Sequence, residues 1–196
     1  MDLSGLKWPV IILVVVGVVV LLLVIVFGIG AVGAYNRLVS LEEQVNSAWA
    51  QVDTVLQRRY DLIPNLVNTV KGYAAQEREV LTEVTRLRSQ WGEARTPAER
   101  TQAATGLESA LGRLMVVIEN YPELKSNQNF LALQDELSGT ENRIAVERRR
   151  FNETVQTYNS SLRRFPTNII AGLLGFEARP YFEAPGAARE APEVQF

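Results

Sequence analysis

Hydrophobic residues are concentrated in one uninterrupted block near the N-terminus. No charged residue occurs from Trp8 to Asn36, and every position of Val10–Ala34 is apolar. An α-helix needs about 20 apolar residues to cross the hydrocarbon core of a bilayer. The block therefore predicts a transmembrane helix over residues 10–34, preceded by a short flank of residues 1–9.

A cleaved signal peptide is the alternative interpretation of this block. Small residues at positions 31–34 would suit a cleavage site, but the apolar run exceeds the roughly 7–15 residues of a signal h-region. Asp2 also cancels the charge of Lys7, which leaves a thin basic region. Trp8 and Tyr35 flank the block, where aromatic rings favour the headgroup zone. We favour an uncleaved anchor, whose first partner is the lipid bilayer.

Apolar residues after Tyr35 recur at three- and four-residue steps, the period of amphipathic α-helices. One such stripe begins at Leu38, a second at Leu66 and a third at Leu107. No proline or glycine interrupts the chain from Ala34 to Tyr60. The transmembrane helix is therefore expected to run directly into the first soluble helix.

Proline and capping residues divide the stripes into separate helices. Arg58–Pro64 predicts a corner or a sharp kink, because proline removes one helical hydrogen bond and disfavours helix at the preceding residue. Asp61 is the expected N-cap of the following helix, which should continue to Trp91. Thr96-Pro97-Ala98-Glu99 fits a capping box with proline at the first helical position.

The fourth stripe has a heptad repeat, which is typical of coiled-coil packing. Large apolar residues are spaced seven apart without a slip, and several are aromatic, which suits the core of a bundle. The heptad positions are Phe130, Leu137, Ile144, Phe151, Tyr158 and Phe165.

These patterns predict an all-α fold. An N-terminal transmembrane helix is followed by an antiparallel up-and-down four-helix bundle with long helices, over residues 35–165. After Pro166 the chain is first apolar and then rich in proline, alanine and glutamate, so residues 166–196 are expected to form a non-helical C-terminal tail.

Composition then excludes several functions. The chain of 196 residues has a net charge of −2, with neither cysteine nor histidine. Disulfides, thiolate or imidazole metal sites and a histidine general base are therefore absent. No phosphate-binding glycine loop or nucleophile elbow occurs. We predict no enzyme, no cofactor, no metal and no small-molecule substrate.

Charged residues give no sign of nucleic-acid binding. Arg148-Arg149-Arg150 makes the fourth helix locally basic, but Glu141, Glu147 and Glu153 interleave with it. A solvated helix face is the simpler interpretation, and contact with anionic lipid or an acidic partner is the alternative. The carboxylate pairs of the chain, such as Glu42-Glu43, are typical of exposed helix faces.

Two segments are candidates for partner contact. In the first, Asp61, Asn65 and Asn68 would share one helix face, which is either a partner-contact strip or a hydrogen-bonded helix corner. In the second, apolar residues of the tail would contact a partner or the membrane surface. The candidate residues are Arg58, Arg59, Asp61, Asn65, Asn68, Ile169, Ile170, Leu173, Leu174, Phe176, Tyr181 and Phe182.

Several segments together resemble the LemA family over the whole chain. The most specific is Arg58-Arg59-Tyr60-Asp61-Leu62-Ile63-Pro64-Asn65-Leu66-Val67. The others are Tyr35–Val39, Ala48-Trp49, Val70–Tyr73, Glu119–Lys125, Asn129–Gln134, Thr140–Ala145, Tyr158-Asn159, Phe165-Pro166 and the stretch from Gly175-Phe176 to Tyr181-Phe182. The chain departs from the family at Gln76-Glu77, where a His-Glu pair is expected.

The resemblance implies a single-pass bacterial membrane protein with its short N-terminus outside and its bundle in the cytoplasm. The charges near the anchor neither support nor exclude this orientation. Family members look like non-enzymatic adaptors, sometimes linked to quality control by membrane proteases. We therefore expect a membrane-anchored scaffold or adaptor whose partners are other membrane proteins. The alternative is a structural protein that self-assembles into a homo-oligomer at the membrane.

Overall fold

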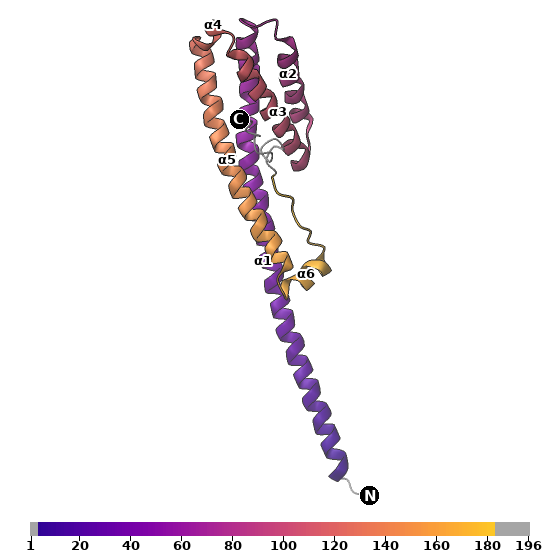
Figure 1. Cartoon of the computed structure of the whole chain (residues 1–196). Coiled ribbons are helices and arrows are strands. Elements are labelled where there is room, and N and C mark those ends of the chain that lie inside the picture. Colours follow the sequence, from indigo (N-terminus) through magenta and orange to yellow (C-terminus); the bar gives the residue numbers. More distant parts are fainter. Residues whose placement is uncertain (1–3, 183–196) are drawn as a thin grey trace, which may run out of the picture. The chain divides into compact units, whose positions relative to one another are not determined.

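The computed structural model describes residues 4–182, with side chains described for Trp8 and for residues 10–182. Within this part of the chain every regular element is helical, as the sequence predicted. The helices are α1 (Ser4–Lys71), α2 (Arg78–Glu93), α3 (Pro97–Ile118), α4 (Pro122–Lys125), α5 (Gln128–Arg163) and α6 (Thr167–Leu174). Figure 1 shows α1 as one ribbon that begins near the N-terminus.

The chain divides into two compact units. The first, here called the anchor unit, comprises Met1–Gln44 and Gln156–Arg179. The second, the core unit, comprises Val45–Val155 and Pro180–Phe196.

Helix α1 is the one described helix that is long and apolar enough to cross a membrane. Its apolar side chains over residues 10–30 are all exposed. As predicted from the lack of proline and glycine after Ala34, the apolar block continues without a break into the following helical stripe.

Of the predicted corner or sharp kink at Arg58–Pro64, the corner is wrong, because α1 continues as a helix through Pro64 to Lys71. Asp61 is consequently an interior helical residue and not an N-cap. Proline inside a helix costs about 3 kcal/mol, mainly through one lost hydrogen bond and a steric clash. Burial offsets this cost, since side chains on both sides of Pro64 enter the core at roughly 1.5–3 kcal/mol each. These side chains are Leu62, Ile63, Leu66 and Val67.

The first interruption instead follows Lys71, so the predicted single helix up to Trp91 is also wrong. Residues 72–77 form turns, and α2 begins at Arg78. The apolar stripe gave no sign of this break, because Tyr73 and Val80 are seven positions apart and would share one helix face.

The predicted start of α3 is confirmed in detail. Thr96 Oγ1 accepts a hydrogen bond from the Glu99 backbone N–H at 3.2 Å, and Glu99 Oε2 accepts one from the Thr96 N–H at 3.2 Å. A further hydrogen bond from the Arg95 N–H, at 2.8 Å, lowers the pKa of the Glu99 carboxyl. Pro97 occupies the first helical position.

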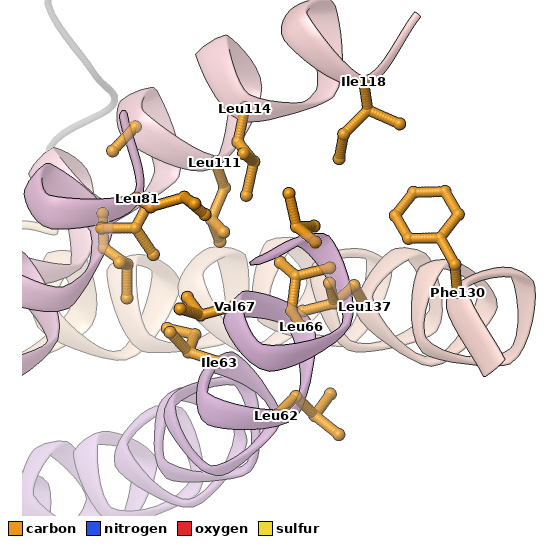
Figure 2. Close-up of a cluster of buried hydrophobic side chains, with 14 of the residues drawn as sticks. Leu62, Ile63, Leu66, Val67, Leu81, Leu111, Leu114, Ile118, Phe130 and Leu137 are labelled. Atoms are coloured by element: carbon orange, nitrogen blue, oxygen red, sulfur yellow. The ribbon is translucent and has the colours of Figure 1, made fainter. Parts of the chain in front are cut away.

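The main apolar cluster lies within the core unit. Buried side chains of α1, α2, α3, α4 and α5 contribute to it, and Figure 2 shows Ile63, Leu81 and Leu111 pointing into the same space. Leu66, Leu114 and Leu124 are fully buried there.

The heptad positions of α5 are buried at Phe130, Leu137, Ile144, Phe151 and Tyr158. The sixth position departs from the pattern, since Phe165 is 81% exposed. Helix α5 ends at Arg163 because Pro166 disfavours helix at the residue before it. The apolar seam of the helix therefore stops one heptad earlier than the sequence pattern predicted.

Residues 167–174 correct the expected non-helical tail, because they form α6. Gly175 follows with φ of 75°, a left-handed conformation that glycine adopts without strain and that commonly terminates helices. Residues 175–182 have no regular structure, as expected. The remainder of the predicted tail, 183–196, lies outside the described residues.

Candidate partner-contact surfaces

The predicted polar strip of α1 lies on an exposed helix face. Asp61, Asn65 and Asn68 are all exposed, and their spacing of four and three residues places them on one side of the helix. Asp61 Oδ1 accepts a hydrogen bond from Gln57 Nε2 one turn earlier, at 2.8 Å. The three side chains therefore remain accessible to a partner, although the corner that would have explained them is absent.

The two arginines before this strip have different environments. Arg58 is half exposed, and its Nη2 lies 2.8 Å from Oε1 of Glu136 on α5. Arg59 is only 7% exposed and belongs to the interior of the core unit. Consecutive helical residues differ by about 100° in direction, so the pair does not form one basic surface.

Buried Arg59 is the centre of a charged cluster whose carboxylates reach solvent, since the Glu141 side chain is 59% exposed and that of Glu108 29%. Its Nη2 lies 3.6 Å from Glu141 Oε2, and burial lowers the pKa of the guanidinium. The neighbouring carboxylates of Glu141 and Glu108 act in the opposite direction, and Arg148 adds to the lowering. The two carboxylates therefore partly compensate the effect of burial on the Arg59 guanidinium.

A cavity beside Arg59 is too small for a substrate. It is lined by Tyr60, Trp91, Glu108 and Arg148, among others, and has a volume of about 10 Å³. That volume corresponds to about one water molecule. The charged cluster thus serves packing and charge compensation inside the core unit.

Two carboxylates, those of Glu42 and Glu77, are engaged in structural contacts. Glu42 Oε1 lies 2.7 Å from Arg179 Nη2 within the anchor unit. Glu77 Oε1 accepts a hydrogen bond from the Tyr121 hydroxyl at 2.6 Å, which raises the pKa of that hydroxyl. Among the residues with described placement, no group of three or more carboxylates is arranged to hold a metal ion.

The apolar residues that were predicted as contacts in the tail are partly exposed and partly buried on α6. In the anchor unit Ile169 is 48% exposed, Leu173 79% and Leu174 52%, whereas Ile170 is buried. The ring of Phe176 is half buried and meets the edge of Tyr35, with ring centres 6.0 Å apart. Three of the predicted residues thus form an outward apolar face, called here the α6 face: Ile169, Leu173 and Leu174.

Phe182 is buried in the core unit, whereas its neighbour Tyr181 is 48% exposed. The Phe182 ring stacks on Trp49 at 6.3 Å, and the guanidinium of Arg148 lies 4.3 Å from its centre. The side-chain amide of Asn152 accepts from the Phe182 N–H at 2.8 Å and donates to the Phe182 carbonyl at 3.0 Å.

In the anchor unit a second asparagine pairs with the backbone of a single residue in the same way. Asn159 Oδ1 accepts from the Arg179 N–H, and Asn159 Nδ2 donates to the Arg179 carbonyl, both at 2.9 Å. Sequence reasoning missed Asn152 and Asn159 as functional residues. The two asparagines are seven residues apart and therefore share one face of α5, which could have indicated a common role. Nothing in the sequence connected them with residues 20 to 30 positions later.

A family match accompanies this geometry, since residues 48–196 match the model of the LemA family. The chain belongs to the LemA family. Its relatives include "Magnetosome protein MamQ 2" and "Magnetosome protein MamQ 1" of Paramagnetospirillum magneticum, each 27% identical over 76% of this chain. "Protein LemA" of Metamycoplasma hominis is 26% identical, over 78% of this chain and 70% of its own length.

The match confirms the resemblance drawn from the segments around Arg58–Val67. The chain spans 64% of the length of the magnetosome relatives, so it corresponds to only part of those proteins. Together, the family and the apolar α1 identify a membrane-associated protein.

The different environments of Arg58 and Arg59 lead to a first prediction. Arg59→Ala removes a buried side chain and leaves a cavity in the core unit, so it should lower the free energy of unfolding by about 2–4 kcal/mol. Arg58→Ala breaks an exposed pair and should cost at most about 1 kcal/mol. Denaturant unfolding followed by circular dichroism measures both, and equal costs would contradict the placement of Arg59.

Proposed function

We propose that this LemA-family chain is a membrane-anchored, non-enzymatic scaffold or adaptor that presents its helical domain to other membrane proteins. The observation that carries the proposal is the continuity of α1 from the apolar block into the core unit. A domain joined to the apolar block by a continuous helix is tethered to the bilayer, where other membrane proteins are its nearest targets. We further propose that the domain lies in the cytoplasm, as the family resemblance implies, and that it acts in quality control of membrane proteins.

We further infer that the core unit is an antiparallel up-and-down four-helix bundle of α1, α2, α3 and α5. Their side chains share one apolar cluster, and only Ala94–Thr96 separates α2 from α3. Short connections favour antiparallel neighbours. Such a bundle supplies rigid helix faces, which suit protein contact better than catalysis.

The α6 face is proposed to lie on the membrane surface. Its exposed leucines and isoleucine would be costly in water, and large exposed apolar patches mark contact sites. Phe176 links the end of α6 to Tyr35, the first residue after the apolar block. Tyrosine at this position favours the lipid headgroup zone, which supports membrane contact for the adjacent helix.

Self-assembly receives less support than a scaffold for other proteins. The heptad seam of α5 motivated it, but the residues from Phe130 to Tyr158 at this seam are buried within the chain itself. The seam is therefore not free to bind a second copy.

The scaffold proposal is tested by site-specific photo-crosslinking of the full chain in native membranes. A photoreactive amino acid replaces Asn65 on the exposed α1 face, and the control replaces Ser109, which is exposed on α3. We expect a discrete membrane-protein adduct from position 65 and none from position 109. Absence of any adduct from position 65 or its neighbour 68 would contradict the proposal.

Membrane contact of the α6 face gives a separate prediction. Because the chain has no cysteine, Leu173→Cys provides a single labelling site, and Ser138→Cys on exposed α5 is the matched control. In lipid nanodiscs, an environment-sensitive fluorophore at position 173 should emit at shorter wavelength and be quenched by brominated lipid. Equal spectra and quenching at the two positions would overturn the membrane placement of α6.

A further inference from the structure

Phe182 is the one buried residue of the described stretch 177–182. Every residue from Glu177 to Tyr181 is exposed, whereas Phe182 is only 5% exposed. One buried ring and the two hydrogen bonds of Asn152 thus hold this end of the segment in the core unit. Arg179 is held separately by Asn159 and Glu42. The end at Phe182 has few contacts of its own, so it opens far more easily than the whole domain unfolds.

Asn152 recognises backbone and not side chain. A carboxamide carries a donor and an acceptor side by side, and here both are used by the N–H and the carbonyl of one residue. The same pairing occurs between neighbouring strands, so any extended residue with a free N–H satisfies it. Proline is excluded at this position because it lacks the N–H.

The surroundings of the ring select an aromatic side chain. Trp49 stacks on the Phe182 ring at an interplanar angle of 30°, and Phe151 supports Trp49 edge-on, with ring centres 5.6 Å apart. Arg148 lies over the same Phe182 ring and is also 3.3 Å from Glu108, which helps to hold it there. Stacking and the cation–π contact both need an electron-rich ring, and an aliphatic residue would lose both.

An open groove continues from this site. It has a volume of about 430 Å³ and is lined by Trp49, Ala98, Thr101, Phe151 and Tyr181, among others. The described part of the chain's own segment leaves this space open. A longer or differently shaped peptide anchored at the same place would gain contacts in the groove.

We propose that Trp49, Arg148 and Asn152 form a receptor for an extended segment of a partner protein that carries an aromatic residue. The chain's own Phe182 fills this receptor until the partner replaces it. A partner segment that also fills the groove offers a net gain of contacts. A second copy of this chain would offer only the contacts already made within one chain, and would lose association entropy as well. This inference rests on the proposed scaffold function and names the kind of segment that it recognises.

The test measures binding of a fluorescent peptide to the full chain in lipid nanodiscs. The peptide has the sequence of residues 177–185, Glu-Ala-Arg-Pro-Tyr-Phe-Glu-Ala-Pro. Phe182→Ala removes the tethered ring and leaves only the backbone pairing with Asn152 to compete. It should bind this peptide at least about tenfold more tightly than the unmodified chain, because a tethered competitor acts at millimolar effective concentration. Adding Asn152→Leu to that variant should weaken binding about tenfold through two lost hydrogen bonds.

Modified peptides separate backbone from ring recognition. N-methylation of the peptide phenylalanine removes the backbone N–H that donates a hydrogen bond to Asn152. Replacing the same phenylalanine by alanine removes the aromatic ring. Both changes should reduce binding to the Phe182→Ala chain by about tenfold or more. Phe182→Leu is the second variant, used if Phe182→Ala lowers the helical circular dichroism signal.

Binding that is equal for the unmodified and the emptied chain, or insensitive to Asn152→Leu, would overturn the inference. Self-association that disappears with Phe182→Ala would assign the receptor to a second copy and would also overturn it. The scaffold proposal fails separately, if the peptide binds as expected but position 65 forms no adduct in native membranes.

Discussion

The structure depends on the helical continuity of α1 across Pro64. The apolar block and the first wall of the core belong to the same helix, so a break at this point would separate them. Proline disfavours that continuity by about 3 kcal/mol. Burial of Leu62 and Ile63 before it, and of Leu66 and Val67 after it, more than compensates. Tertiary packing therefore decides the local structure against the intrinsic preference of the chain.

Much of the fold was predictable because strong periodic signals coincide with strong physical constraints. The apolar block, the capping box at Thr96–Glu99 and most of the α5 heptads were all confirmed. Errors occurred where local and tertiary effects compete. Pro64 lies inside a helix, residues 72–77 form turns without a proline, and α6 forms in a stretch that looked irregular.

The candidate surfaces were harder to predict, because burial of a side chain depends on contacts distant in the sequence. Periodicity correctly placed Asp61, Asn65 and Asn68 on one exposed face. It could not show that Arg59 is buried beside exposed Arg58, or that Phe182 is inserted next to Trp49. Asn152 and Asn159 gain their roles only when the chain returns to α5 after α6.

One helix, α1, combines an apolar span with a wall of the core, and exposed surfaces remain for contact with lipid and protein. Hydrogen exchange of the full chain in lipid nanodiscs tests the continuity of α1 most directly. If α1 is continuous, amides from residue 56 to residue 70 should exchange slowly as one block on both sides of Pro64. Rapid exchange confined to residues 58–66 would indicate a hinge there and would contradict the account.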